Sequence, residues 1–299
     1  MKNLSLRLPR LLFLCGLAAF LVPLAQQEQA FRKDAEEYAI IAESISVSGK
    51  TKMKQTESPE KEDNEPSRKD QPIHHPENLP SSAYMQETST FDLPPETDER
   101  ILADDTRSLD LSACLAVNPD FIAWLRIPGT SIDYPVVQSG DTDYYLHHLF
   151  TGKKSSLGCL FSLPDADYKT PGRNIPIYGH HLRTGDAMFS SLIRYKKPEW
   201  LDEHSSIRMD SLFGSRTYRV FAVVNYSVGD WNPSIAYMND RDFGAFLKEA
   251  SKRFLIQTEV SVNPTDHILT LITCDRSYGG VSGRLAVLAV QEKTEKENP

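Results

Sequence analysis

The stretch 270–275 reads Thr-Leu-Ile-Thr-Cys-Asp and places a cysteine at the end of an apolar run that favours β-structure. This composition predicts a strand over 268–273, so Cys274 is expected where the strand leaves the sheet. A thiol at that place, between polar Thr273 and Asp275, is predicted to face a groove. The alternative is a small buried apolar side chain, which is the commonest state of a free cysteine. Taken alone, the stretch favours the alternative.

Further runs on both sides of this stretch favour short strands, and several alternate apolar with polar residues as half-buried antiparallel strands do. They lie at 123–127, 132–137, 175–178, 218–226 and 285–290. Two segments favour helices: 109–117, which ends before Asn118-Pro119, and 240–254. The second has one apolar face, made by Phe243, Phe246, Leu247, Ala250 and Phe254. The sequence therefore predicts a mainly β domain over 101–291, with a barrel as its expected form and helices at its periphery.

A short apolar segment lies near the N-terminus. Residues 11–25 carry no charge and follow Lys2, Arg7 and Arg10. As a helix the segment covers about 22 Å, against a hydrocarbon core of about 30 Å, so snorkelling basic residues or a thinned bilayer must make up the difference. A cleaved signal peptide is the alternative, although the residues at its cleavage site fit poorly. We expect an uncleaved membrane anchor, with residues 1–10 in the cytoplasm and the rest of the chain on the extracellular face.

The composition changes twice between this segment and the domain. Residues 26–46 favour a helix that leaves the membrane. Residues 47–100 are rich in Lys, Glu, Pro and Ser and contain few large apolar side chains, so they cannot bury enough surface to offset the entropy of ordering. We expect them to form a disordered spacer, and residues 292–299 to form a disordered tail.

The composition also excludes several classes of protein. A net charge of −8 leaves no basic excess to neutralise phosphates, so we expect no nucleic-acid partner. The sequence has no glycine-rich phosphate loop, no clustered carboxylates for calcium and no CxxC pair, so we expect neither cofactor nor metal. The four cysteines are Cys15, Cys114, Cys159 and Cys274. Because Cys15 lies in the apolar segment, an odd number remains elsewhere, and Cys274 is our candidate for a free thiol.

A second candidate for chemistry is the segment 177–182, Ile-Tyr-Gly-His-His-Leu, where a predicted strand runs into a loop. A histidine there titrates near neutral pH and can carry a proton to and from a reacting group. The alternatives are a surface histidine or half of a metal site. Neighbours in an extended chain point to opposite faces, so His180 and His181 make a poor chelating pair.

A third candidate is Arg284, which opens the apolar run 285–290 ten residues after Cys274. If the two apolar runs form neighbouring antiparallel strands, Arg284 returns to the end of the sheet that carries Cys274. A fixed guanidinium beside a thiol–carbonyl adduct could donate hydrogen bonds to the developing oxyanion. Taken alone, Arg284 is better interpreted as an ordinary surface arginine.

The three candidates together have a specific spacing, with Gly-His ninety-four residues before the cysteine and arginine ten residues after it. In this the sequence resembles the sortase family, and within it class B, from about residue 109 to 290. The matching segments are WLRIPGT at 124–130, IDYPVVQ at 132–138, YYL at 144–146, IYGHH at 177–181, Met188-Phe189 and TLITCD at 270–275. The predicted helix at 240–254 resembles an extra helix that is typical of class B. The sequence departs from the family around 161–163 and at Cys159, which puts the fine details of substrate preference in doubt.

The resemblance implies a closed eight-stranded β-barrel with peripheral helices, including an N-terminal helix and the extra helix before the cysteine strand. It makes Cys274 the nucleophile that carries the acyl thioester, His180 the general acid/base and proton donor, and Arg284 the oxyanion stabiliser. His180 matches rather than His181 because the family histidine directly follows glycine. Asp275 either orients His180 or is a solvated loop carboxylate.

The implied activity is that of a cysteine transpeptidase that first acts as an endopeptidase. It would cut surface proteins after Thr within a C-terminal sorting motif of the NPxTx, LPxTG or SPxTG type. The acyl group would then pass to an amine of the peptidoglycan cross-bridge. A pilus-polymerising sortase is the alternative within the family. The loops at 168–173 and 229–237 are candidates for recognising the motif.

Three classes outside the family remain as alternatives. An L,D-transpeptidase also uses His, Cys and Arg, and Arg276 stands two residues after Cys274, but Ile272-Thr273 replaces the expected His-Gly. A papain-like peptidase places cysteine before histidine, the reverse of the order here. A catalytically silent surface adaptor would lack a selectively reactive Cys274.

Overall fold

The computed structural model describes residues 28–46, 109–166, 168, 172–233 and 239–293. The expected cytoplasmic segment 1–10, the apolar segment 11–25 and the spacer 47–100 lie outside these residues, as does most of the tail at 292–299. Within the described ranges, no helix has both the length and the apolar character needed to cross a membrane.

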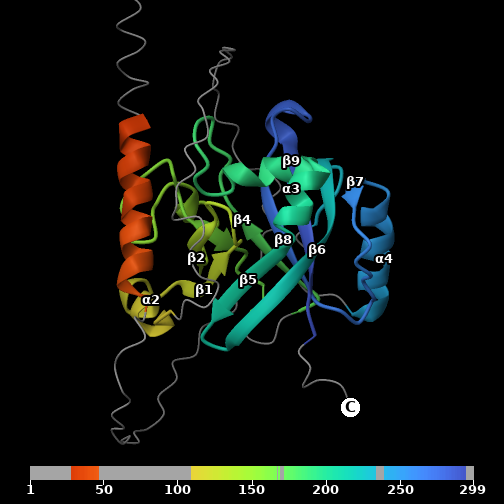
Figure 1. Ribbon diagram of the computed structural model, residues 1–299, viewed down its shortest axis with the longest axis horizontal. Coiled ribbons are helices and arrows are strands. Elements are labelled where there is room, and N and C mark those ends of the chain that lie inside the picture. Colours follow the sequence, from red (N-terminus) through yellow and green to blue (C-terminus); the bar gives the residue numbers. More distant parts are fainter. Residues whose placement is uncertain (1–27, 47–108, 167, 169–171, 234–238, 294–299) are drawn as a thin grey trace, which may run out of the picture.

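A closed β-barrel forms the centre of the molecule (Figure 1). Eight strands form the barrel, and β7 lies beside it. The strands are β1 Phe121–Arg126, β2 Asp133–Gln138, β3 Leu160–Ser162, β4 Asn174–Tyr178, β5 Ser206–Ser211, β6 Gly214–Ser227, β7 Phe254–Gln257, β8 Ile268–Cys274 and β9 Gly283–Gln291. They pair in the order β5-β1-β2-β3-β4-β8-β9-β6-β7. The further pairing of β5 with β6 closes the barrel and leaves β7 at the outer edge of β6. The predicted mainly β, eight-stranded barrel is confirmed.

Two of the pairings are parallel, β2 with β3 and β4 with β8, and the others are antiparallel. The parallel β4–β8 pairing positions the site because strands that run in the same direction end at the same edge of a sheet. The C-terminal ends of β4 and β8 therefore lie side by side. The N-terminal end of β9 joins them there, since β9 is the antiparallel neighbour of β8.

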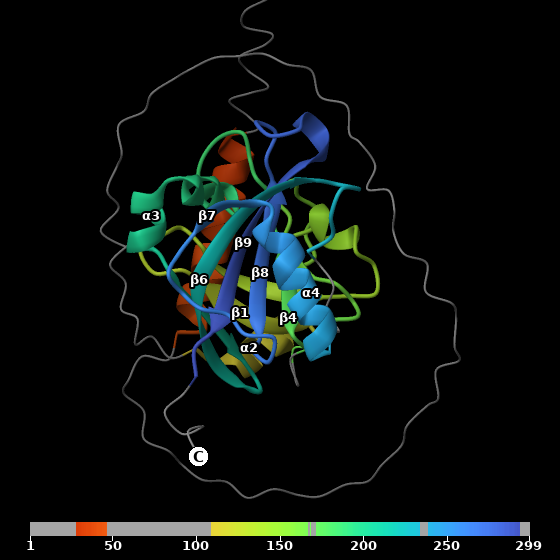
Figure 2. The same cartoon turned by 90° about the vertical axis from the view of Figure 1, so that its right-hand side faces the viewer.

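Strand β8 is buried on both faces up to Thr273, which explains why large apolar residues make up most of its sequence. Alternate residues enter two different cores. Leu271 packs in the barrel interior, whereas Ile272 packs outside against α4 Asp240–Ser251. Figure 2 shows α4 lying across this outer face. Because side chains alternate along a strand, Cys274 belongs to the same outer face as Ile272.

Helices surround the barrel. They are residues 28–44, α2 Leu111–Val117, α3 Pro198–Glu203 and α4, with 3-10 turns η2 Tyr144–Leu146, η3 Ser190–Lys196 and η4 Gly280–Ser282. Helix α2 is capped by Asp110, whose side chain accepts hydrogen bonds from the amides of Ser112 and Ala113. It lies where the sequence predicted a helix at 109–117, two residues shorter at its start.

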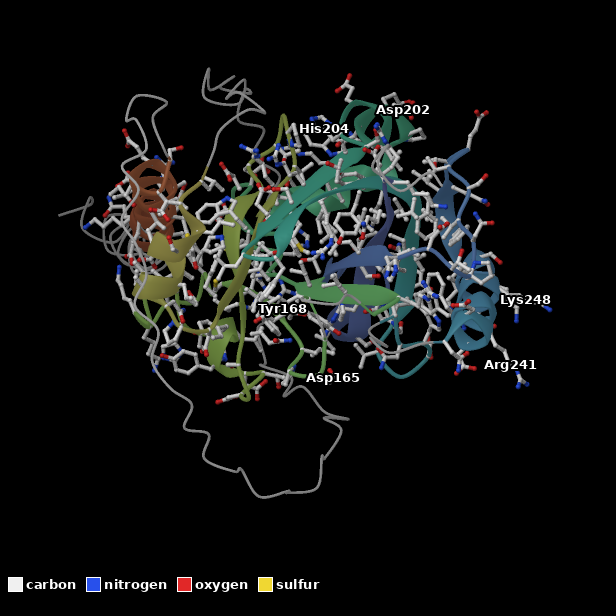
Figure 3. All side chains as sticks on the ribbon, turned by 90° about the horizontal axis from the view of Figure 1, so that it is seen from below. Asp165, Tyr168, Asp202, His204, Arg241 and Lys248 are labelled. Atoms are coloured by element: carbon white, nitrogen blue, oxygen red, sulfur yellow. The ribbon has the colours of Figure 1, made fainter. Side chains whose placement is uncertain are left out.

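Helix α4 lies where the sequence placed the extra helix, and it begins after the cap Asn239. Its apolar face is buried, whereas Arg241 and Lys248 point away from the barrel (Figure 3). The prediction was wrong at the C-terminal end, because the helix ends at Ser251 and Phe254 begins β7. Pairing with β6 takes over there, so the helical spacing of Phe254 does not reflect a helical position.

The helix over 28–44 packs along the wall of the barrel, on the side of β1 and β2 (Figure 1). Its buried side chains include Tyr38 and Ala42, and Ile45 follows them into the same core. Ser46 then forms a β-bridge with Leu109. The segment that was expected to leave the membrane as a helix is therefore helical over its described part, and it belongs to the folded body.

Candidate active site

Cys274 ends β8 and lies opposite Arg284, the second residue of β9. Arg284 in turn lies opposite Tyr226 of β6. Directly opposite residues in an antiparallel pair place their Cβ atoms about 5 Å apart on the same face. The three side chains therefore form one row across three strands, at the end of the barrel where β8 stops. Cys274 is a free thiol in this row and is only partly buried.

Strand β4 brings His180 to the same end of the barrel. Tyr178 pairs with Ile272 in the parallel β4–β8 register, and the Gly179 amide continues the ladder by donating to the Ile272 carbonyl at 3.1 Å. His180 lies two residues after Tyr178, and Cys274 lies two residues after Ile272. The ninety-four-residue spacing seen in the sequence is thus the register of the two strands, and it sets His180 and Cys274 at neighbouring positions.

The imidazole of His180 is held by backbone. Its Nε2 lies 2.9 Å from the carbonyl oxygen of Leu146. Since a carbonyl oxygen only accepts, this contact assigns the proton of the neutral ring to Nε2 and leaves Nδ1 for proton exchange. Burial lowers the pKa of His180, the Leu146 carbonyl opposes this, and the charges of His147 and Arg276 lower the pKa further. The ring is therefore mainly neutral near neutral pH.

The guanidinium of Arg284 is held by its own loop. Its Nη1 donates to the carbonyl oxygens of Val281 at 3.0 Å and Gly283 at 2.9 Å. In the described part of the chain no carboxylate pairs with it, so its charge is available to an anion that forms beside Cys274. Burial raises the pKa of Tyr226 well above its usual value, and the charge of Arg284 opposes this rise while that of Cys274 adds to it. These effects are consistent with the close spacing of the row.

His181 contacts the backbone of Cys274 rather than its thiol. The Nδ1 of His181 donates to the Cys274 carbonyl oxygen at 2.8 Å. The two adjacent histidines therefore have different partners, as expected of neighbours in an extended chain. The sequence separated them by resemblance alone, whereas the structure gives His181 a contact of its own at the end of β8.

Asp275 pairs with Lys196 of η3 rather than with His180. The Ser277 hydroxyl also donates to its carboxylate, at 2.6 Å. Burial alone would raise the pKa of Asp275, but the ion pair with Lys196 and the hydrogen bonds from Ser277 together outweigh burial and lower it. The carboxylate is almost fully buried. Both predicted roles, an orienter of His180 and a solvated loop carboxylate, are therefore wrong.

The loop from Cys274 to Arg284 closes on itself. The Asp275 amide donates to the Gly283 carbonyl at 2.9 Å. A Cβ atom added to Gly283 would lie only 2.2 Å from the Asp275 carbonyl oxygen, so this approach requires glycine. The buried carboxylate of Asp275 thus anchors the segment that sets Arg284 opposite Cys274.

Two further aromatic rings pack next to Tyr226. The ring of Trp231 meets that of Tyr226 edge-on, with centroids 5.5 Å apart, and stacks on that of Phe246 of α4, with centroids 5.4 Å apart. Trp231 belongs to the loop 229–237, which the sequence singled out for substrate recognition, although residues 234–237 lie outside the described chain. Sequence reasoning missed Tyr226, because a tyrosine in an apolar strand carries no sign of a functional site. In the other candidate loop, Tyr168 contacts Phe213, and residues 169–171 lie outside the described chain.

The two other described cysteines are core residues. Cys114 is buried in α2, and burial raises its pKa to about 11. Cys159 is buried before β3, and burial raises its pKa to about 12. All three described cysteines are free thiols, and no group of side chains in the described ranges has the composition of a metal site.

Comparison with known proteins agrees with this geometry. Residues 125–292 match the family model of the sortase domain. Sortase B of Listeria monocytogenes is 31% identical over 175 residues, which cover 57% of this chain and 69% of that protein. Sortase B of Staphylococcus aureus is 31% identical over 174 residues, which cover 58% of this chain and 70% of that protein.

Solved structures show the same fold. The X-ray structure of Clostridium perfringens sortase B superimposes with a TM-score of 0.57 at 30% identity, covering 62% of this chain and 100% of that one. A Staphylococcus aureus sortase B–substrate complex gives a TM-score of 0.57 at 29% identity, covering 62% and 85%. The chain therefore belongs to the sortase family of cysteine transpeptidases, and within it to class B.

Proposed function

We propose that Cys274, His180 and Arg284 carry out transpeptidation on the sorting signals of surface proteins. The single observation that supports this most strongly is the register of β4, β8 and β9. It sets the three residues at neighbouring positions at one end of the barrel. Cys274 and Arg284 belong to neighbouring strands and His180 follows β4 by two residues, so their arrangement depends on the fold rather than on a local motif.

The first half of the reaction forms a thioester. The thiolate of Cys274 attacks the carbonyl carbon of a threonine in the signal, and the carbonyl oxygen becomes an oxyanion that the Arg284 guanidinium stabilises. As the tetrahedral intermediate collapses, the C–N bond breaks and protonated His180 gives its proton to the leaving amine. The active form therefore pairs an ionised Cys274 with a protonated His180.

The second half transfers the acyl group to a new amine. Neutral His180 takes a proton from the attacking amine, the thioester bond breaks, and Cys274 leaves as thiolate. We expect the amine to come from a peptidoglycan cross-bridge, because the class B resemblance favours anchoring of surface proteins over pilus assembly. If water replaces the amine, the same site acts as an endopeptidase.

The substrate is a C-terminal sorting signal of the NPxTx, LPxTG or SPxTG type. A solved complex of a relative, Staphylococcus aureus sortase B, is described as a substrate complex. In this chain Trp231, which is half-buried and packs edge-on against the buried Tyr226, offers an apolar surface beside Cys274 and Arg284 for the residues that precede the threonine.

We propose further that residues 11–25 anchor the chain in the cell membrane, with residues 1–10 in the cytoplasm and the barrel outside. The uncharged run and its basic flank support this. The helix over 28–44 begins at the same end of the barrel as η4 (Figure 1). The row of Cys274 and Arg284 would then face the bilayer from which a sorting signal emerges.

The alternative of an L,D-transpeptidase depends on Arg276. That side chain is exposed on the loop after β8, whereas Arg284 lies directly opposite Cys274. The register therefore favours the sortase mechanism.

The test uses the full-length chain with peptides that carry NPxTx, LPxTG or SPxTG motifs and with triglycine as the amine. Mass spectrometry should detect a thioacyl adduct on Cys274 and a peptide–triglycine product. Cys274→Ala should abolish both, and an adduct that persists in this variant would refute the assignment. A vinyl-sulfone probe distinguishes the enzyme from a catalytically silent surface adaptor. It should modify Cys274 selectively in the enzyme and not in the adaptor.

A further inference from the structure

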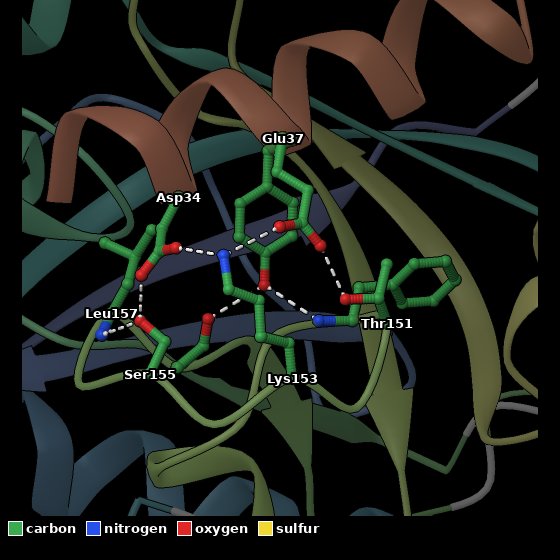
Figure 4. Close-up of polar contacts among 9 residues, drawn as sticks. Asp34, Glu37, Thr151, Lys153, Ser155 and Leu157 are labelled. Atoms are coloured by element: carbon green, nitrogen blue, oxygen red, sulfur yellow. Dashed lines mark hydrogen bonds and ion pairs between the residues drawn. The ribbon is translucent and has the colours of Figure 1, made fainter. Parts of the chain in front are cut away.

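One buried hydroxyl of the helix over 28–44 bonds to the barrel at two places. The Oη of Tyr38 donates to the carbonyl oxygen of Gly158 at 2.8 Å and accepts from the amide of Phe150 at 3.1 Å (Figure 4). Burial raises the pKa of Tyr38 well above its usual value, so the hydroxyl keeps the proton that it donates. The Tyr38 ring meets Tyr134 of β2 edge-on at 5.3 Å. One side chain thus joins both ends of the segment 150–158 to the helix.

Acidic side chains of the same helix hold the middle of that segment. Asp34 accepts from Lys153 at 2.7 Å and from the Ser155 hydroxyl, and Glu37 accepts from Thr151 at 2.6 Å (Figure 4). The Ser155 hydroxyl in turn accepts from the Leu157 amide at 3.0 Å. The segment 150–158 is therefore bonded to the helix along its whole length, from Phe150 to Gly158.

The other side of Gly158 faces the active site. A Cβ atom at Gly158 would lie 3.0 Å from Cδ2 of His180, 2.8 Å from the carbonyl oxygen of Tyr145 and 3.1 Å from that of Leu146. Gly158 also has φ +67°, a conformation that favours glycine. The next amide, that of Cys159, donates to the Tyr145 carbonyl at 2.9 Å. Gly158 therefore lies between the Tyr38 hydroxyl and the pocket that holds the imidazole.

We propose that Tyr38 is a positioning residue for His180, acting through Gly158 to hold the Leu146 carbonyl where it accepts from Nε2. The helix over 28–44 would then fix both the orientation and the tautomer of the imidazole. Removing the Tyr38 hydroxyl frees Gly158 to move, and the pocket made by Gly158, Tyr145 and Leu146 moves with it. The activity side of this inference rests on the proposed function, whereas the state of the ring can be measured without it.

The charged and titratable groups around the ring come from three segments. His147 follows the Leu146 carbonyl, and Arg276 lies on the loop two residues after the end of β8. His181 follows in the chain and is bonded to the Cys274 carbonyl. Tyr38 carries no charge, so its loss changes none of these charges, and its effect must pass through the Leu146 contact. Weakening that contact removes a hydrogen bond that stabilises the protonated ring, so the titration midpoint should fall.

The experiment compares Tyr38→Phe with Ser211→Ala in the full-length chain. The Ser211 hydroxyl has the same pattern of partners, donating to the Gly214 carbonyl at 3.0 Å and accepting from the Phe213 amide at 3.2 Å. Ser211 is the last residue of β5 and pairs with Gly214, at the opposite end of β6 from Tyr226. Both variants delete one buried hydroxyl, and only the first adjoins the His180 pocket.

The readout is NMR of ¹⁵N-histidine, with the His180 signals assigned by comparison with His180→Gln. We expect Tyr38→Phe to lower the midpoint of the His180 titration and to mix the Nδ1–H tautomer into the neutral ring. We expect Ser211→Ala to leave both unchanged. With a sorting-signal peptide, kcat should fall about tenfold at unchanged KM. A wild-type tautomer and midpoint in Tyr38→Phe would overturn the inference.

A milder variant keeps the test decisive if Tyr38→Phe does not fold. Lys153→Ala removes an exposed side chain that bonds to Asp34 and Glu37. It should move the His180 signals in the same direction by a smaller amount, and unchanged signals in a folded Lys153→Ala variant would then count against the inference. Shifted signals in a chain that forms no thioacyl adduct would refute the proposed function and leave the role of Tyr38 in place.

Discussion

Two carboxylate–lysine pairs support the site from different sides, and they differ in how far water reaches them. The Asp275 side chain is 2% exposed and its partner Lys196 23%. The Asp34 side chain is 11% exposed and its partner Lys153 54%. The first pair anchors the loop from Cys274 to Arg284, and the second ties the helix over 28–44 to the segment beside His180. The Asp275–Lys196 pair is thus largely buried, whereas the Asp34–Lys153 pair lies at the surface.

The difference in exposure should decide what each pair contributes. An exposed ion pair contributes little because water and salt screen it, and breaking it costs little. Removing one partner of a buried pair leaves a charge without compensation in a medium of low dielectric constant. We therefore expect the Asp275 pair to govern stability, and the Asp34 pair to act mainly on the precision of the His180 pocket.

The largest expected effect compares the two lysines. Lys196→Ala should lower the free energy of unfolding by about 3 kcal/mol, because it leaves Asp275 buried without its partner. Lys153→Ala should lower it much less, because water and salt screen this exposed lysine. Urea unfolding of both variants at neutral pH measures the difference. Adding Asp275→Asn to Lys196→Ala should restore part of the loss, and equal losses for the two single variants would contradict the comparison.

A second expected effect concerns the acid dependence of the buried pair. The pKa of Asp275 is lowered in the folded protein, so its contribution is fully present above the unfolded value of about 3.9 and is lost as pH falls through the folded pKa. Asp275→Asn removes the contribution at every pH. The stability gap between wild type and this variant should therefore stay at its full size down to about pH 5 and narrow as pH falls below about 4. Thermal unfolding across this range measures it, and a gap that stays constant would contradict the assignment.

A third expected effect concerns His181, which ties the end of β4 to the Cys274 carbonyl. His181→Ala should lower kcat about fivefold, the loss that corresponds to one hydrogen bond of about 1 kcal/mol. The matched control is His267→Ala, because His267 Nδ1 also contacts a backbone carbonyl, that of Gly172 at 3.1 Å, at the opposite end of β8. Peptide turnover by the two variants measures the effect. A similar loss in both would show that His181 supports the fold in general rather than the position of Cys274.

The strands that carry Cys274 and Arg284 could be predicted because their signals are local. Cys274 closes an apolar run, and Arg284 follows it at the distance of an antiparallel neighbour. His180 was found by resemblance, and the parallel β4–β8 register supplies the physical reason for its spacing. Strand β5 was missed although its residues alternate, because only Ile207 and Met209 are apolar and two apolar residues make a weak strand signal.

The supporting contacts could not be predicted, because they join residues that the sequence does not relate. Asp275 and Lys196 are brought together by a 3-10 turn without periodicity. The helix over 28–44 has an apolar face, but nothing in that face names the barrel wall as its partner rather than a membrane. Cys159 and Cys274 look alike as isolated thiols, and only burial separates them.

The smallest expected effect comes from His180 itself and lies in a different pH window from that of Asp275. Burial lowers the pKa of His180 in the folded protein, so the unfolded chain binds a proton more readily at this site. Stability contributed by the neutral ring is present above the unfolded value of about 6.5 and is lost as pH falls below it. His180→Gln cannot take up that proton, so its stability should fall less than that of the wild type between pH 7.5 and 5. Urea unfolding at both pH values measures this, and a parallel fall in the two proteins would show that His180 is solvated like an ordinary surface histidine.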